Sequence, residues 1–138
     1  MIGQLRNQPV GPLSYMSVTE HPNAIDWILG QFRGNPEKIA IEFHTGTWTY
    51  GELDKVSSSI ASNLKTAGIA NGAMVGVSVN RSPELIASVL GIVRAGAAYV
   101  PFDPEYPIER KKSMVEDSRP ALIICDNENA GAFEGLPV

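Results

Sequence analysis

Three carboxylates lie close together in a proline-rich segment of the chain. Asp103, Glu105 and Glu109 fall within seven residues, interleaved with prolines at positions 101, 104 and 107. Such a group could bind a metal or divide acid and base roles between its members. Asp103 stands directly before Pro104, however, and Asp in that position favours a turn in which the side chain accepts local backbone N–H groups. Glu109 falls in the first turn of an expected helix, where a negative charge favours the helix dipole. We therefore interpret the three acids as structural.

The other candidates for chemistry are two histidines and one cysteine. His21 and His44 have no Cys or acidic partner at a metal-ligand spacing, and His44 is expected in a solvated turn. Cys125 is the only cysteine, so an intramolecular disulfide is impossible and a reducing cytoplasm is the simplest location. It follows the apolar run 121–124, which predicts a buried, unreactive thiol.

No glycine pattern of a phosphate-binding loop is present. Neither G-x-G-x-x-G nor G-x-x-x-x-G-K-[ST] occurs in the chain. Gly76 lies within an apolar strand pattern and is interpreted as a close-packing position. The run Ser57 to Ser59 is expected on the outer and flanking positions of a helix, and no Ser-His-Asp or Cys-His arrangement is formed. The residue types alone predict no catalytic, cofactor-binding or metal-binding residue.

Composition narrows the classes of partner. The 138 residues carry a net charge of −4 and are 43% hydrophobic, which suits one globular domain with a real core. No basic patch is evident, which argues against nucleic acid and anionic membranes as partners. The cluster 110–112 is expected to be a solvated helix face. No apolar stretch approaches the roughly 18–20 residues of a membrane span, and the first 20 residues do not resemble a signal peptide.

Residues 1–22 are expected to form a flexible arm, and we assign residues 23–138 to one domain. The elements that must position the candidate residues begin at the start of this domain. Asn23 is a candidate cap for a helix that runs to about Phe32. Apolar residues at 39, 41 and 43 alternate with residues 38, 40 and 42, which predicts a strand over 38–43. A turn at Thr45-Gly46 and a second short strand over 47–49 complete the expected hairpin.

The clearest helix follows the hairpin. Thr49 and Glu52 fit a capping box, in which each side chain accepts an otherwise unpaired N–H of the first turn. Apolar residues then recur at steps of three and four, which predicts one buried stripe. The stripe consists of Leu53, Val56, Ile60, Leu64 and Ala67. Gly68 is well placed to end the helix.

Strands and helices alternate in the second half of the chain. The pattern predicts strands over 74–79, 98–102 and 121–125, with helices starting at Ser82-Pro83 and near Pro107. The first of these helices has little polar face and is expected to be buried on two sides. Residues 127–138 read as a weak tail. The alternation predicts an α/β fold with a parallel sheet and crossover helices.

The proline-rich segment resembles a known family. Residues 93–110 are similar to the second core motif of nonribosomal peptide synthetase adenylation domains, written approximately L-K-A-G-x-A-Y-V-P-x-D-P-x-Y-P-x-E-R. Val93 and Arg94 are conservative departures from it. The first core motif resembles residues 48–53, and residues 114–120 match the family's usual continuation. The resemblance covers about 23–124.

The resemblance implies the N-terminal subdomain of the adenylate-forming fold, a superfamily that includes acyl-CoA synthetases and luciferases. Family members join a carboxylate to the α-phosphate of ATP, with Mg²⁺, and release pyrophosphate. Synthetase members then pass the aminoacyl group to the phosphopantetheine thiol of a carrier protein. In the family the phosphate loop, substrate pocket and catalytic Lys come after this segment. The resemblance therefore implies an N-terminal fragment that is inactive and binds no cofactor alone.

Partners follow from the same resemblance. It implies the remainder of the adenylation domain, a carrier protein and a possible MbtH-like activator, which in the family docks near the position held here by Ser118. A simpler interpretation is that Ser118 only ends a helix. Two alternatives stay open for function: a non-catalytic binding module or split subunit, and a fragment of an acyl- or aryl-acid ligase of the same superfamily.

Overall fold

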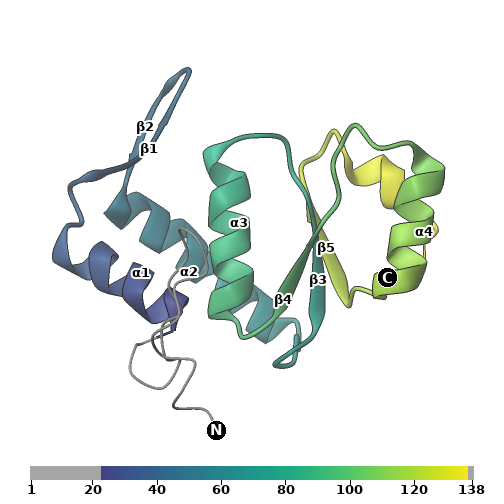
Figure 1. Ribbon diagram of the computed structural model, residues 1–138, viewed down its shortest axis with the longest axis horizontal. Helices are drawn as coiled ribbons and strands as arrows, with labels where there is room; N and C mark the ends of the chain where they lie inside the picture. The colour runs from purple at the N-terminus through teal and green to yellow at the C-terminus, as the bar shows by residue number, and fades with distance from the viewer. Residues whose placement is uncertain (1–22, 137–138) are drawn as a thin grey trace, which may run out of the picture.

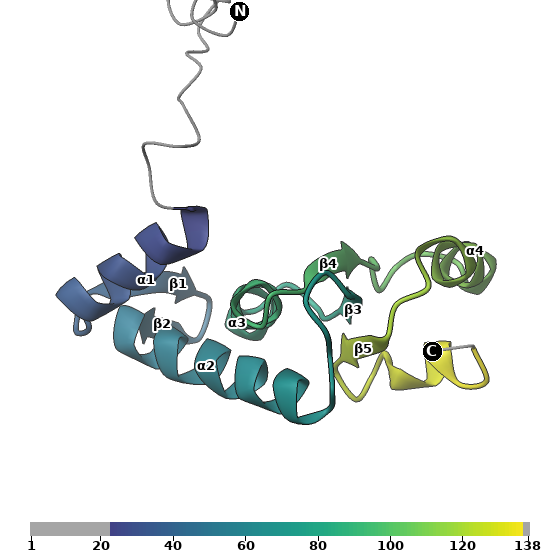
Figure 2. The same cartoon turned by 90° about the horizontal axis from the view of Figure 1, so that it is seen from below.

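The computed structural model describes residues 23–136, which form an α/β arrangement (Figure 1). The elements are α1 (Ala24–Gly34), β1 (Ile39–Phe43), β2 (Gly46–Thr49), α2 (Tyr50–Thr66), β3 (Met74–Ser78), α3 (Pro83–Arg94), β4 (Ala98–Pro101), α4 (Ile108–Ser118), β5 (Leu122–Cys125) and the 3-10 turn η2 (Ala130–Phe133). The expected arm, residues 1–22, lies outside the described residues. Figure 2 shows α2 and α3 on one side of the sheet, with α4 and the C-terminal turn on the other.

The predicted helix starts are confirmed. Asn23 Oδ1 accepts the Asp26 N–H at 2.9 Å. The capping box is complete, because Thr49 Oγ1 accepts the Glu52 N–H at 3.2 Å and Glu52 Oε2 accepts the Thr49 N–H at 2.7 Å. α3 begins with Ser82 as its cap and proline in its first turn. Each cap satisfies backbone donors that a first turn leaves unpaired.

The sheet has the predicted parallel topology. Its strand order is β4-β3-β5, and all three strands run in the same direction. Val75 of β3 lies opposite Tyr99 of β4 and Leu122 of β5. Since β3 is central and the chain crosses from β4 past it to β5, the helices α3 and α4 lie on opposite faces.

The two faces of the sheet pack into different cores. Val75 and Val77 pack with α2 and α3, whereas the alternate positions face α4, as the period of two requires. Gly76 belongs to the α4 face, where a Cβ atom would lie 2.8 Å from both Ile123 Cγ1 and Phe102 Cε2. The close-packing interpretation of Gly76 is therefore confirmed.

The hairpin forms as predicted, but its burial differs. β1 and β2 pair antiparallel, with an irregular register between Ile39 and Ile41. Because of this irregularity the side chains do not alternate cleanly: Ile39 and Phe43 are exposed, while Ala40 and Ile41 both pack on the core beside α2. The predicted strand is thus present, although its apolar residues do not share one buried face.

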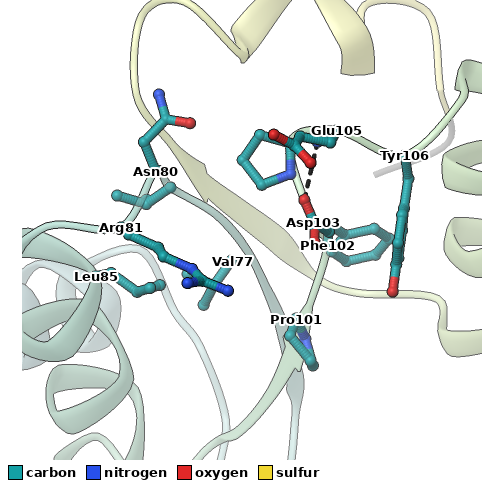
Figure 3. A pocket seen from close by; sticks show the side chains of 11 residues that line it. Val77, Asn80, Arg81, Leu85, Pro101, Phe102, Asp103, Glu105 and Tyr106 are labelled. Carbon is teal, nitrogen blue, oxygen red and sulfur yellow. Dashed lines mark hydrogen bonds between the residues drawn. The ribbon is translucent and has the colours of Figure 1, made fainter.

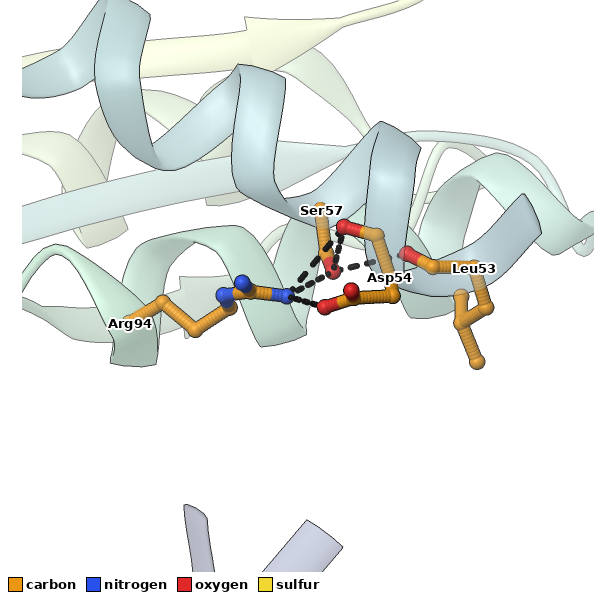
Figure 4. A network of polar contacts seen from close by, with 4 residues as sticks. All are labelled: Leu53, Asp54, Ser57 and Arg94. Carbon is orange, nitrogen blue, oxygen red and sulfur yellow. Dashed lines mark hydrogen bonds and ion pairs between the residues drawn. The ribbon is translucent and has the colours of Figure 1, made fainter. Parts of the chain in front are cut away.

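Helices α2 and α3 cross at close range. A Cβ atom at Gly91 would lie 2.6 Å from Ile60 Cγ2, so only glycine permits this approach. The small side chain of Ser57 fills the contact and is 0% exposed. Its hydroxyl donates to the Leu53 carbonyl oxygen at 2.7 Å and accepts a hydrogen bond from Arg94 Nη1 at 2.9 Å (Figure 4). The expectation that Ser57 lies on an outer position was wrong. The buried stripe of the helix was predicted from apolar residues alone, and Ser57 is polar.

Burial of α3 on two sides is only partly observed. Ala87 and Ile92 are fully buried, but Ile86 is 45% and Val93 is 37% exposed. α3 contacts α2, the sheet and α1, and Ile86 and Val93 lie on a side that these contacts cover only in part. Ala67 is exposed as well, since α2 ends at Thr66. The exposure of Ile86, Val93 and Ala67 exceeds the expectation because the described elements cover these positions only in part.

Candidate functional site

A pocket of about 680 Å³ opens at the carboxyl ends of β3 and β4 (Figure 3). This edge of a parallel sheet is where α/β folds usually place ligands. Three segments contribute to the lining: the end of β3 with the start of α3, the end of β4, and the residues that follow it. The lining residues are Val77, Val79, Asn80, Arg81, Leu85, Pro101, Phe102, Asp103, Pro104, Glu105 and Tyr106.

The wall formed by residues 101–107, which we call the hook, is held by local hydrogen bonds. Asp103 Oδ1 accepts the Glu105 N–H at 2.9 Å, and the Tyr106 N–H donates to the Asp103 carbonyl oxygen at 3.0 Å. The predicted turn role of Asp103 is confirmed. Glu109 lies in the first turn of α4, also as predicted.

Helix α4 fixes the hook from behind. Lys111 is only 4% exposed, and its ammonium group donates to the Pro104 carbonyl oxygen at 2.8 Å. Arg110 stacks over the Tyr106 ring with 4.0 Å between the guanidinium carbon and the ring centroid. The expectation of a solvated face over 110–112 was therefore wrong for Lys111, because α4 turns this residue inward toward the hook and Phe133.

Among the described residues that line the pocket, Arg81 is the one that carries a positive charge. Its side chain extends from the end of β3 over Val77 toward Pro101 (Figure 3). Within residues 23–136 it forms no ion pair and no hydrogen bond through its guanidinium. Arg81 was not predicted as a site residue from the sequence. The available signal was its place directly after a buried strand and before a helix cap, where a parallel sheet meets solvent.

On the other side of β3, polar contacts join two strand ends. The Asn80 N–H donates to Asp126 Oδ2 at 3.1 Å, and Asn80 Nδ2 donates to Glu128 Oε2 at 3.4 Å. These bonds tie the end of β3 to the residues after β5. Asp126 and Glu128 are thereby engaged in structure and do not line the pocket.

The remaining candidates do not assemble a catalytic group. His44 is exposed in the turn between β1 and β2, as predicted, and His21 lies outside the described residues. Partial burial, and secondarily the Asp126 carboxylate, raises the pKa of the Cys125 thiol, which makes it less reactive. Within the described ranges no three His, Cys, Asp or Glu residues could hold a metal ion.

Ser118 closes α4. Its hydroxyl donates to the Met114 carbonyl oxygen at 2.6 Å, and Arg119 then adopts a left-handed conformation with φ of 45°. The helix-ending interpretation agrees with this geometry. Contact of Ser118 with a partner stays a prediction. In the part of the chain that the structure describes, no helix combines the length and apolar character needed to cross a membrane.

Known proteins match the same part of the chain. The profile of the AMP-binding enzyme family covers residues 30–136. Syringomycin synthase SyrB1 of Pseudomonas syringae pv. syringae is 40% identical over 103 residues, which cover 75% of this chain and 17% of that protein. Tyrocidine synthase 2 of Brevibacillus parabrevis is 40% identical over 97 residues, which cover 70% of this chain and 3% of that protein.

Solved structures show the same fold. VinN, which has also been solved with L-aspartate, superposes with a TM-score of 0.76 at 29% identity, covering 83% of this chain and about a third of that chain. The four-domain nonribosomal peptide synthetase AB3403, solved with AMP and glycine, gives 0.75 at 37% identity, covering 86% of this chain and 9% of that chain. The chain thus spans only a small part of the relatives that it matches.

Proposed function

This chain belongs to the AMP-binding enzyme family, and from that premise we propose that it is the N-terminal part of an adenylation domain that activates an amino acid. The complete domain would join the amino acid to the α-phosphate of ATP, release pyrophosphate and transfer the aminoacyl group to a carrier-protein thiol. The observation that carries this proposal is the proline hook, whose residues form the wall that joins β4 to α4. The 37% identity to a nonribosomal peptide synthetase solved with AMP and glycine supports it.

The described residues contribute architecture to that activity. The hook ends β4, turns the chain and starts α4, while Lys111 holds the turn from behind. In an acyl-adenylating reaction most of the rate comes from preorganised contacts to the phosphates and the carboxylate. The chain has no phosphate-loop pattern, and the described residues offer no acidic cluster for Mg²⁺. They do not fit ATP and Mg²⁺, so we assign binding of these groups to the remainder of the domain.

Two exposed apolar residues of α3 suggest where the remainder would pack. Ile86 and Val93 lie seven residues apart, on one side of α3, and both are substantially exposed. Exposed apolar side chains that share a helix face favour association with a partner. We place the remainder of the domain on this face. A carrier protein bearing phosphopantetheine, and an MbtH-like activator near Ser118, belong to the proposal as partners of the complete protein.

ATP–pyrophosphate exchange tests the proposal. The purified chain is assayed alone with a panel of amino acids and aryl acids, and no exchange above background is expected. It is then mixed with the complementary part of the adenylation domain, produced separately. Recovery of exchange with an amino acid supports the proposal and shows that the two parts can work as a split pair. Exchange by the chain alone would refute the assignment of ATP binding to the remainder. Recovery only with aryl acids would favour the acyl- or aryl-acid ligase alternative.

A further inference from the structure

We propose that the outer edge of β5 receives a further β-strand, which the remainder of the adenylation domain supplies. The inference rests on the proposed function and deepens it, because it names a contact between the two parts in addition to the exposed face of α3. Three observations carry it. β5 is paired on one side only, the opposite edge of the sheet is blocked, and the side chains of β5 are incompletely covered on both faces.

The parallel sheet has two outer edges, which are formed by β4 and β5. Figure 2 shows β3 between them, and β3 pairs with both. Among the described strands, none pairs with the other side of β4 or of β5. The Ala121 N–H donates to the Met74 carbonyl oxygen of β3 at 2.8 Å. Because the bonded residues of an edge strand alternate along a parallel ladder, the backbone groups of Leu122 and Ile124 point away from β3.

The outer edge of β4 is a poor template for another strand. The Ala98 N–H donates to the Ala73 carbonyl oxygen of the β3 side at 2.9 Å, so Tyr99 and Pro101 occupy the outward positions. Proline has no N–H, and prolines on edge strands are one way in which proteins prevent further pairing. Within Ala98–Pro101 the Tyr99 N–H is therefore the single outward donor, and the chain enters the hook directly afterwards.

The outer edge of β5 has no such protection. Its sequence, Leu-Ile-Ile-Cys, contains no proline and no charged residue, which is the composition of an edge that pairs with another strand. All four side chains are half-buried, whereas four of the five in β3 are buried. Leu122 and Ile124 pack on the core beside α2 and α3, and Ile123 packs on the core beside α4. A strand added next to β5 would extend both cores.

The residues that flank β5 define the kind of strand that fits. Pro120 precedes β5 and has no N–H to offer. Asp126 follows β5, and its carboxylate oxygens already accept the Asn80 and Asn129 N–H groups, each at 3.1 Å. The free edge therefore spans residues 121–125. Because strands of a parallel sheet with helices on both faces are apolar on both sides, the expected partner is an apolar strand of about five residues.

A strand of the same domain fits this edge better than a second copy of the chain. Stable interfaces between separate proteins bury about 1,200 Å² or more, and a strand edge of about five residues offers little contact area. A covalently connected strand is held at a high effective concentration and does not need so large an interface. A copy related by a two-fold axis would also pair antiparallel, against the parallel arrangement of this sheet. The chain covers 17% of syringomycin synthase SyrB1 and 32% of VinN, so such relatives have much further polypeptide.

Amide hydrogen exchange, measured residue by residue, tests the inference. The 138-residue chain is compared with a fusion in which the complementary part of the adenylation domain follows residue 138. The amides of Leu122 and Ile124 should exchange at least about tenfold more slowly in the fusion, because each gains a hydrogen-bond acceptor. The Tyr99 amide, which is the outward donor of the opposite edge, is the internal control and should change by less than about twofold.

Two variants at one position separate backbone pairing from side-chain packing. Ile124→Pro removes the outward N–H, whereas Ile124→Ala shortens the side chain and keeps the N–H. In the fusion, Ile124→Ala should retain the slow exchange of the Leu122 amide, and Ile124→Pro should return it to within about twofold of the rate in the chain alone. Amide dispersion of each variant chain shows whether it is folded. If Ile124→Pro unfolds the chain, the unsubstituted fusion still decides, through the amides of Leu122, Ile124 and Tyr99.

The results also separate this inference from the proposed function. Unchanged exchange of Leu122 and Ile124 in the fusion would overturn the inference, and the proposed function would stand if that fusion catalyses ATP–pyrophosphate exchange with an amino acid. Equal slowing of the Tyr99 amide would overturn the choice of edge. Slowing at Leu122 and Ile124 that depends on the concentration of the chain alone would assign the edge to a second copy and would also overturn the proposal. Slow exchange at both residues in a fusion that activates only aryl acids would support the added strand and contradict the amino-acid function.

Discussion

The ammonium nitrogen of Lys111 lies 2.8 Å from the carbonyl oxygen of Pro104, so a buried lysine of α4 holds the turn that precedes its own helix. Proline cannot donate a backbone hydrogen bond, and the hook contains three prolines, so it has few ladder bonds of its own. The lysine contact compensates for this shortage. The hook therefore depends on α4 for its shape, as well as leading into it.

The variant Lys111→Met tests this dependence. Methionine keeps the length and apolar stem of the side chain and removes the ammonium group, which donates to Pro104 and lies 5.8 Å from the centre of the Phe133 ring. We expect the free energy of unfolding to fall by about 1 kcal/mol, and exchange of the Glu105 and Tyr106 amides to accelerate. Lys112→Met is the control, because Lys112 lies on the exposed side of α4 and should change stability by less than about 0.5 kcal/mol. Urea unfolding and hydrogen exchange give both values, and equal stability of the two variants would contradict the account.

Packing around Gly76 gives a second prediction. A methyl group at this position would lie 2.8 Å from Ile123 Cγ1 and Phe102 Cε2, inside a filled core. Gly76→Ala should therefore destabilise the protein by about 1–3 kcal/mol through overpacking. Gly30→Ala should have the opposite sign, with stability raised by about 0.5–1 kcal/mol, because Gly30 lies within α1 and no atom lies near its added methyl. Thermal unfolding of the two variants measures the signs, and a shift in the same direction for both would refute this packing argument.

Much of the fold could be predicted from sequence because its signals are local. Caps at Asn23, Thr49 and Ser82 and the alternation after residue 74 involve residues within a few positions of each other. Those signals were sufficient for the parallel topology, the hairpin and the helix starts. The resemblance of residues 93–110 to a core motif supplied the family.

The errors arose where the outcome depends on a distant neighbour. Ser57 is buried because Gly91, on α3, lets that helix approach α2 closely. No local sequence pattern in α2 indicates this contact. Lys111 was grouped with two exposed cations, although its partner is a carbonyl group seven residues earlier. Arg81 was overlooked because the pocket around it forms only when β3 and β4 align. Sequence spacing identifies elements well, but such sites require their three-dimensional arrangement.

Reactivity of Cys125 gives a prediction with a defined dependence on pH. Partial burial, and then the Asp126 carboxylate, raises the pKa of this thiol in the folded state. Folding thus favours the protonated form, so its contribution to stability is full below the unfolded pKa and is lost as pH rises through the folded pKa. Iodoacetamide labelling should be slower in the folded chain than in urea, with a rate profile displaced to higher pH. Asp126→Asn should move the folded profile part of the way back, and a profile displaced to lower pH would exclude this explanation.

Two buried serines with different hydrogen bonding provide the sharpest test of the packing. The Ser57 hydroxyl is bonded to the Leu53 carbonyl oxygen and to Arg94 Nη1, which also contacts Asp54 Oδ1 at 2.6 Å (Figure 4). Ser78 is also 0% exposed, but its hydroxyl has no hydrogen-bond partner among the described residues. Ser57→Ala should lower the free energy of unfolding by about 1–2 kcal/mol, because it removes one hydrogen-bond acceptor from the partly buried Arg94 guanidinium and the hydroxyl donor of the buried bond to the Leu53 carbonyl oxygen. Ser78→Ala, the same chemical change at equal burial, should be neutral or stabilising, because it removes a desolvated group that no hydrogen bond compensates. Urea unfolding of both variants decides the matter: equal losses would mean that burial of the side chain, and not its hydrogen bonding, determines the cost.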